Sequence, residues 1–137
     1  MNSIPERPPA LDPAAVHAFV IAGHGDLDAV RAALAYEPGV VDASWDWGGG
    51  DWETALGGAT HMGRRDIPYE LLAHGARVDV FAAAMLGEVE IVRALLDAFP
   101  ALRDARGPHG IPLLAHAEAG GEDARGVVEL LQSVTAA

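Results

Sequence analysis

The residues best suited to chemistry gather in one short segment, residues 45–53, which reads WDWGGGDWE and holds all three tryptophans. Indole rings and glycines can wall a pocket, and carboxylates at its rim, here Asp46, Asp51 and Glu53, can bind a ligand or transfer protons. Two other readings stay open: a tryptophan that packs into a small core of its own, or a flexible loop. The segment is therefore a candidate site for a partner or a ligand.

A glycine pair, Gly57 and Gly58, follows this segment inside the next expected helix. Glycine within a helix costs about 1 kcal/mol relative to alanine, so the pair should serve a purpose. Without two Cβ atoms the helix has a notch where another group can lie on its backbone. We expect the occupant to be a tryptophan of residues 45–53 or, alternatively, a bound ligand.

Histidine beside carboxylates can act as a general base, because an ordinary imidazole titrates near neutral pH. If the chain is an enzyme, the candidates for this role are Asp51, Glu53 and His61. No His-x-Glu-x-x-His pattern occurs, cysteine is absent, and the chain has no nucleophile motif and no phosphate-binding loop. The sequence therefore predicts no metal site and no cofactor, and it favours a protein that is not an enzyme.

Several helices must position these residues. Asp12 with Pro13 is typical of a helix start, and Asp26 is suited to cap a second helix that ends at the Glu-Pro-Gly of residues 37–39. Residues 36–53 are expected to form a long loop, because the three consecutive glycines suit no regular element. Further on, an apolar helix pattern recurs at a similar distance after each of four glycines: Gly25, Gly63, Gly87 and Gly120.

This order of helix, glycine turn and helix resembles the ankyrin repeat family. The second unit carries the family pattern most fully, and the third and fourth units match through their alanines, turn glycines and paired leucines. The matching residues of the second unit are Asp51, Thr54, Leu56, Ala59, Gly63, Leu71, Leu72, Gly75, Ala76 and Asp79.

The resemblance implies an all-α fold, an ankyrin-type helix-turn-helix solenoid with short or irregular β-hairpin fingers. A lead-in, residues 1–11, should precede one domain, residues 12–137. Its repeats are expected at approximately 12–42, 43–78, 79–105 and 106–137. Two departures from the family concern the links between units: the link from Asp79 to Val80 leaves almost no room for a β-hairpin finger, and the loop before the second unit is long.

The resemblance also implies function, since ankyrin arrays mostly bind other proteins. We expect an interaction module that binds a protein partner through its concave face, where His24 and His61 occupy nearly equivalent places. The alternative is a small-molecule binder or enzyme with a pocket beneath residues 45–53. The predicted contact residues are Trp45, Asp46, Trp47, Asp51, Trp52, Glu53, Gly57, Gly58, His61, Met62, Met85 and His109. His116 is expected to be a hydrogen-bonded core histidine tied to the turn at residues 107–112.

Composition narrows the partners. The formal net charge of −11 disfavours nucleic acids and anionic membrane surfaces, which need a basic face. No apolar run approaches the roughly 20 residues of a membrane span, and the first nine residues lack the apolar core of a signal peptide. With no cysteine present, these features predict a soluble, cytoplasmic protein with an unidentified protein or small-molecule partner.

Overall fold

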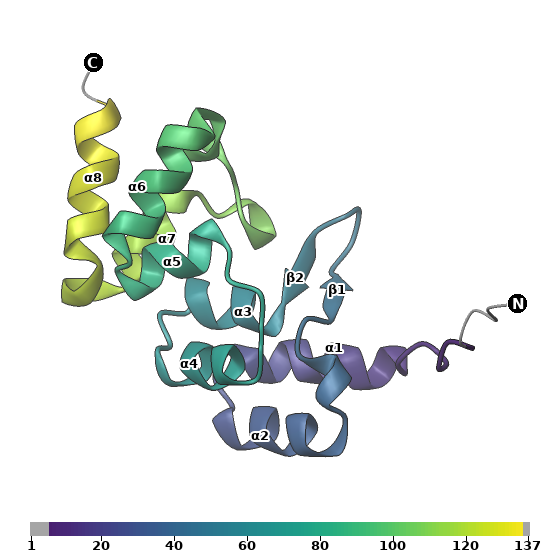
Figure 1. The fold of residues 1–137 in the computed structure, drawn as a ribbon. Coiled ribbons are helices and arrows are strands. Elements are labelled where there is room, and N and C mark those ends of the chain that lie inside the picture. Colours follow the sequence, from purple (N-terminus) through teal and green to yellow (C-terminus); the bar gives the residue numbers. More distant parts are fainter. Residues whose placement is uncertain (1–5, 136–137) are drawn as a thin grey trace, which may run out of the picture.

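The computed structural model describes residues 6–135 of the chain. Residues 1–5 of the expected lead-in and residues 136–137 of the expected fourth repeat lie outside them. The described residues form a mostly helical domain with one hairpin (Figure 1). The α-helices are α1 (Pro13–Gly23), α2 (Leu27–Tyr36), α3 (Ala55–His61), α4 (Asp66–Ala73), α5 (Val80–Leu86), α6 (Val89–Ala98), α7 (Leu113–Ala119) and α8 (Arg125–Thr135).

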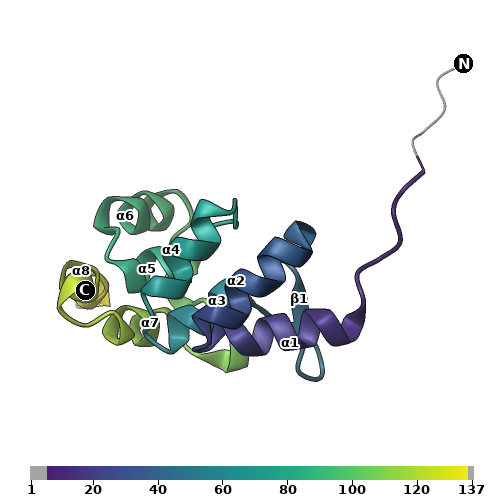
Figure 2. The same cartoon turned by 90° about the horizontal axis from the view of Figure 1, so that it is seen from below.

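The helices pack in consecutive pairs. Helix α1 packs on α3, α3 on α5, and α5 on α7, while α2 contacts α4 and α6 contacts α8. Each odd-numbered helix also packs on the even-numbered helix that follows it. Figure 2 shows this arrangement from below, with α1 and α8 at opposite ends. Within residues 6–135, no helix is long and apolar enough to cross a membrane.

The helix starts follow local sequence. The Asp12 side chain accepts the Ala14 N–H, and Asp26 accepts the Ala29 N–H, so both predicted caps are confirmed. Asp79 caps α5 in the same way, through the Ala82 N–H, directly after the α4–α5 link. The predicted absence of a β-hairpin at this link is confirmed, since no strand lies between residues 73 and 80.

The expectation of a loop over residues 36–53 is wrong. A 3-10 turn, η1 (Pro38–Val40), is followed by strand β1 (Ser44–Asp46), which pairs antiparallel with β2 (Trp52–Thr54). The three glycines form the hairpin turn, with φ values of 141°, 63° and 90° that residues with a Cβ rarely adopt. The Asp46 carboxylate accepts the N–H groups of Gly48 and Gly50, which fixes this turn.

The interior consists of two apolar clusters. The first lies mainly between α1, α2, α3 and α4, and the second between α5, α6, α7 and α8. Met85 is fully buried, so the prediction that it contacts a partner is wrong: the helical pattern that places it on α5 turns its side chain inward. The largest buried side chains of the two halves are Phe19, Leu34, Ile67, Leu71, Met85 and Leu113.

A second turn faces the hairpin. We call residues 107–110 the finger; they contain the short 3-10 helix η3 (Pro108–Gly110) and are closed at their base by a bridge between Arg106 and Pro112. The Gly107 N–H donates to the Ile111 carbonyl at 2.8 Å. The predicted turn at this place is therefore confirmed, and it reaches from the second half of the chain to the hairpin in the first.

Candidate metal centre

Three histidines surround the buried carboxylate of Glu53. Its Oε1 lies 3.0 Å from Nε2 of His24, and its Oε2 lies 3.1 Å from Nε2 of His61 and 3.3 Å from Nε2 of His109. One donor atom from each of the four residues lies within 4.8 Å of all the others. Residues far apart in the sequence therefore meet as one N₃O donor set.

His24 directly follows α1, and its ring occupies the notch left by the glycine pair. A Cβ on Gly58 would lie 2.7 Å from Cε1 of His24, so only glycine makes room for the imidazole. A Cβ on Gly57 would instead approach Pro108 of the finger at 3.3 Å. The prediction that a tryptophan or a ligand occupies the notch is wrong. A histidine fills it, because the C-terminal end of α1, which carries His24, packs on α3.

Glu53 is buried by the alternation of its strand. Successive side chains of a strand point to opposite faces, so the neighbouring Trp52 is 60% exposed while Glu53 is 1% exposed. Thr54 then caps α3 by accepting the Gly57 N–H at 3.0 Å. Helix α3 ends with His61, so the strand and the helix together bring two candidate metal ligands, Glu53 and His61, close to each other.

His109 is held by Asp51 in an unusual backbone conformation. With φ of 61°, it is the only non-glycine among residues 6–135 with a positive φ. One Asp51 oxygen accepts the His109 backbone N–H at 2.7 Å, and the other accepts Nδ1–H at 2.6 Å. The backbone hydrogen bond from His109, followed by the contact with its ring, lowers the pKa of Asp51, which is therefore ionised at neutral pH.

The outer contacts assign the tautomers of two histidines. His24 Nδ1 lies 2.9 Å from the Val20 carbonyl, which can only accept, so Nδ1 carries the proton. His109 Nδ1 donates to Asp51 in the same way. In their neutral forms both rings therefore present the lone pair of Nε2 to the Glu53 carboxylate. Acceptors facing acceptors attract only if a positive charge lies between them, supplied by a proton or a metal ion.

Glu53 itself is ionised. Burial on its own would raise its pKa, but the close contact with His61, the charges of His24 and His109 and the Trp47 indole together lower the pKa below its usual range. Trp47 Nε1–H donates to Oε1 at 3.0 Å. Oε2 of Glu53 and Nε2 of His61 are buried 3.1 Å from each other, and no aligned hydrogen bond satisfies either atom among the described residues. A cation beside them would pair with both atoms.

The donor spacing fits a small transition-metal ion. Zinc binds imidazole nitrogen at about 2.0–2.1 Å, which places the donors of a tetrahedral site about 3.3 Å apart. The three N–O separations, one to Oε1 and two to Oε2 of Glu53, lie close to this value, and the four donor atoms taken one per residue lie within 4.8 Å of one another. The second contacts of the ligands, made by Val20, Asp51 and Trp47, are of the kind that orient ligands around metals.

Five of the predicted contact residues meet at the site. Asp51, Glu53, His61 and His109 meet, with Trp47 against the rings of His24 and His109. His24 was expected on the concave face but was not among the predicted contact residues. The sequence feature that could have identified it is its position in the first unit, nearly equivalent to that of His61 in the second. Other predicted residues act elsewhere: Asp46 holds the hairpin turn, Trp45 stacks on His17, Trp52 faces outward, and Met62 is exposed at the end of α3.

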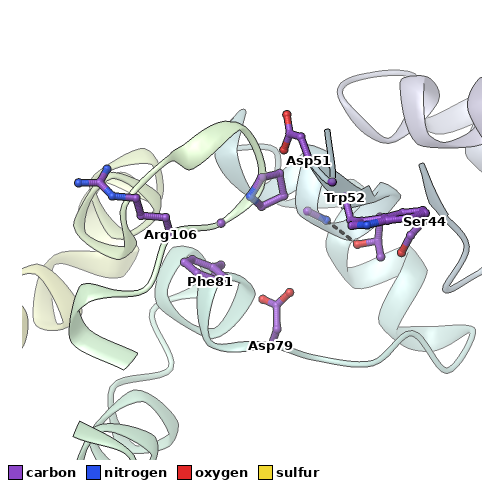
Figure 3. A pocket seen from close by; sticks show the side chains of 11 residues that line it. Ser44, Asp51, Trp52, Asp79, Phe81 and Arg106 are labelled. Atoms are coloured by element: carbon purple, nitrogen blue, oxygen red, sulfur yellow. Dashed lines mark hydrogen bonds between the residues drawn. The ribbon is translucent and has the colours of Figure 1, made fainter. Parts of the chain in front are cut away.

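A polar pocket of about 320 Å³ lies between the hairpin and the finger. Figure 3 shows Asp79 pointing into it, with Trp52 and Phe81 on its sides and the Arg106 guanidinium turned away. Asp51 lines this pocket and also holds His109. Asp51 therefore connects the metal-ligand cluster of His24, Glu53, His61 and His109 to the pocket.

His116 supports the finger from beneath. Its ring is fully buried against Phe81, with centroids 4.8 Å apart, and a Cβ on Gly107 would lie 2.9 Å from its Nε2. Burial, followed by repulsion from His61, lowers the pKa of His116 to about 4. The prediction of a core histidine is confirmed. A backbone contact with Ile111 of the turn acts to raise the pKa of the ring, but neither ring nitrogen has a well-aligned hydrogen-bond partner within residues 6–135.

Comparison of the chain with models of protein families finds no match, and comparison with curated proteins finds no similar one. The function is therefore inferred from the geometry of the site.

Proposed function

We propose that this protein binds one divalent transition-metal ion through His24, Glu53, His61 and His109. The observation that carries the proposal is the fixed orientation of His24 and His109. Each ring donates its Nδ1–H outward and directs the Nε2 lone pair to a buried carboxylate. A cation among these four residues replaces repulsion between acceptors with four attractive contacts. The prediction of no metal site rested on local spacing, which ligands from four separate elements do not require.

The donor set favours zinc. Imidazole suits zinc, copper, iron and nickel, whereas calcium and magnesium prefer sites made entirely of oxygen. Four protein ligands complete a tetrahedral zinc site and leave no open position, which is typical of structural zinc. This arrangement also accounts for Asp51 and Glu53 without acid–base catalysis: one holds a ligand and the other is a ligand.

Metal binding can be tested with purified, metal-free protein. We expect one equivalent of zinc to bind, measured by competition with a chromophoric chelator, and Co²⁺ to give the visible spectrum of a tetrahedral site. His61→Ala should weaken binding at least a hundredfold. His74→Ala is the matched control, because His74 is an exposed histidine whose Nδ1 bonds the Glu70 carbonyl away from the cluster. Equal affinity of the two variants, or no binding by the native chain, would overturn the proposal.

A second candidate is the interaction module. We infer that the helix pairs form an ankyrin-type array, which the consecutive packing of α1, α3, α5 and α7 supports. The turns at Gly63 and Gly87, both with positive φ, support it as well. Exposed Trp52 would then anchor a protein partner near the hairpin. Trp52→Ala should abolish binding to an isolated partner without changing the circular dichroism spectrum; unchanged binding would exclude this anchor.

A further inference from the structure

The four ligands come from two different halves of the molecule. His24 directly follows α1, Glu53 lies in the hairpin and His61 ends α3, and these elements belong to the half with the first apolar cluster. His109 belongs to the finger, which connects the helices of the second cluster. Figure 1 shows the finger between α6 and α7, reaching toward the hairpin. An ion bound by all four residues therefore joins the two halves.

His109 is the ligand that can leave most easily. Its side chain is 35% exposed, more than those of His24, His61 and Glu53. It lies in a three-residue turn next to Gly110, another residue with positive φ. A non-glycine residue keeps a left-handed conformation only where its surroundings hold it there. Here those surroundings are the two oxygens of Asp51 and the metal-ligand cluster.

Without an ion, the side chain of His109 has two polar contacts among the described residues: Nδ1 with Asp51 at 2.6 Å, and Nε2 with Oε2 of Glu53 at 3.3 Å. His24 and His61 are carried by the ends of α1 and α3 and cannot withdraw without disturbing helix packing. The finger can, because its hydrogen bonds to the hairpin are those made by Asp51 among the described residues.

We propose that the finger is a metal-dependent clasp, closed on the hairpin when His109 coordinates the ion and released when the ion is absent. The inference rests on the proposed metal binding and concerns its regulatory consequence. A ligand shifts a conformational equilibrium by the ratio of its affinities for the two states. The closed state offers four ligands and the open state three, so the ion favours closure.

Closure has a consequence for the neighbouring pocket. Asp51 and Trp52 line it from the hairpin, and Gly107 and Pro108 line it from the finger. These two walls keep their separation only while the finger is docked. The metal ion thereby controls the shape of a pocket that it does not itself occupy, through Asp51, which lines the pocket and holds His109.

Hydrogen exchange of the full chain tests the clasp. Backbone amides are followed by NMR in the metal-free protein and after one equivalent of zinc. The N–H groups of Gly107 and His109, which donate to Ile111 and Asp51, are the reporters. We expect zinc to slow their exchange at least tenfold, while amides in the middle of α8 change much less.

His109→Asn is the matched variant. Asparagine tolerates a positive φ and keeps the backbone N–H that donates to Asp51, while the imidazole is lost together with its contacts to the metal-ligand cluster and to Asp51. We expect zinc to bind this variant at least tenfold more weakly through the remaining three ligands. At saturating zinc, exchange of the Gly107 amide should stay as fast as in the metal-free protein. Protection of the finger in His109→Asn equal to that in the native chain would overturn the clasp.

The two proposals fail in different ways. If zinc binds the native chain tightly but leaves exchange of the finger amides unchanged, the clasp is wrong and the metal centre stands. If zinc does not bind, both proposals are wrong. Zinc binding with selective protection of residues 107–111, lost in His109→Asn, supports both.

Discussion

Nε2 of His24 lies 3.0 Å from Oε1 of Glu53, while Nδ1 of the same ring is committed to the Val20 carbonyl. The contact therefore joins a lone pair to a carboxylate unless a proton or a metal ion lies at this position. A buried carboxylate surrounded by imidazoles is costly to maintain when it is not compensated. The arrangement makes the stability of the domain depend on what occupies the cluster.

Glu53→Gln separates the effects of metal and carboxylate. The glutamine amide can donate a hydrogen bond to an Nε2 lone pair, so the metal-free variant should unfold at the same temperature as the metal-free native chain or higher. Adding zinc should no longer raise the unfolding temperature of this variant. For the native chain, free zinc at 100 times Kd adds about 2.7 kcal/mol to the free energy of unfolding.

Thermal unfolding followed by circular dichroism, with zinc and with EDTA, measures both effects for Glu53→Gln. His74→Ala, whose histidine lies outside the cluster, should keep the full zinc-dependent increase in Tm. A zinc-dependent increase that survives in Glu53→Gln would show that the ion binds elsewhere.

Gly58→Ala should weaken metal binding although alanine is the better helix former. Helix propensity alone predicts a gain of about 1 kcal/mol in stability. The new Cβ, however, would lie 2.7 Å from Cε1 of His24, closer than carbon atoms approach. We expect the ring to be displaced and zinc affinity, measured by chelator competition, to fall at least tenfold.

Gly39→Ala is the control for this substitution. Its Cβ would meet only the terminal oxygen of the Glu37 side chain, at 3.3 Å, which can move aside. Zinc affinity should therefore match that of the native chain. If Gly58→Ala also binds zinc with native affinity, His24 is not a ligand.

Trp47→Phe should lower zinc affinity by about tenfold, the lower end of the effect of losing an outer contact. Phenylalanine keeps an aromatic ring beside His24 and His109 but loses the indole N–H that donates to Glu53 at 3.0 Å. The Trp52→Phe control removes an outward-facing indole and should leave affinity unchanged. Zinc titrations followed by the remaining tryptophan fluorescence compare the variants. Equal affinities would remove Trp47 from the site.

The sequence was informative where local chemistry decides structure. Asp12 and Asp26 cap the helices that they were predicted to cap, and the turn at residues 107–110 was expected. The glycine run misled because three glycines suit a tight hairpin turn as well as a loop, and Asp46 decides between them by accepting two backbone N–H groups.

The metal-ligand cluster was harder to predict, because its four members lie in separate elements. Asp51, Glu53 and His61 were identified as one chemical group, but as acid–base groups. Their coordination geometry depends on His24, which reaches them only because Gly58 admits its ring. A motif defined by spacing along the chain cannot predict this contact between His24 and Gly58, because it forms between two different helices.

The buried ring of His116 should make stability depend on pH between about 4 and 6.5. Its pKa is about 4 in the folded protein against an ordinary value of 6.5, so within this window the unfolded chain binds a proton that the folded chain does not. Above pH 6.5 the ring is neutral in both states and the stability of the folded protein is at its full value. As pH falls below 6.5, protonation of the unfolded chain lowers that stability. The shift corresponds to about 3 kcal/mol of unfolding free energy at pH 4.

Urea unfolding of metal-free protein from pH 4 to 7 measures this loss against His116→Leu. Leucine fills a similar volume without the two unpartnered nitrogens, so the variant should be at least as stable as the native chain at pH 7. Carboxylates and the remaining histidines titrate in both proteins, and the difference between their curves therefore isolates His116. That difference should grow as pH falls from 6.5 and level off near 4. A constant difference across the range would mean that His116 is protonated equally in the folded and unfolded chains.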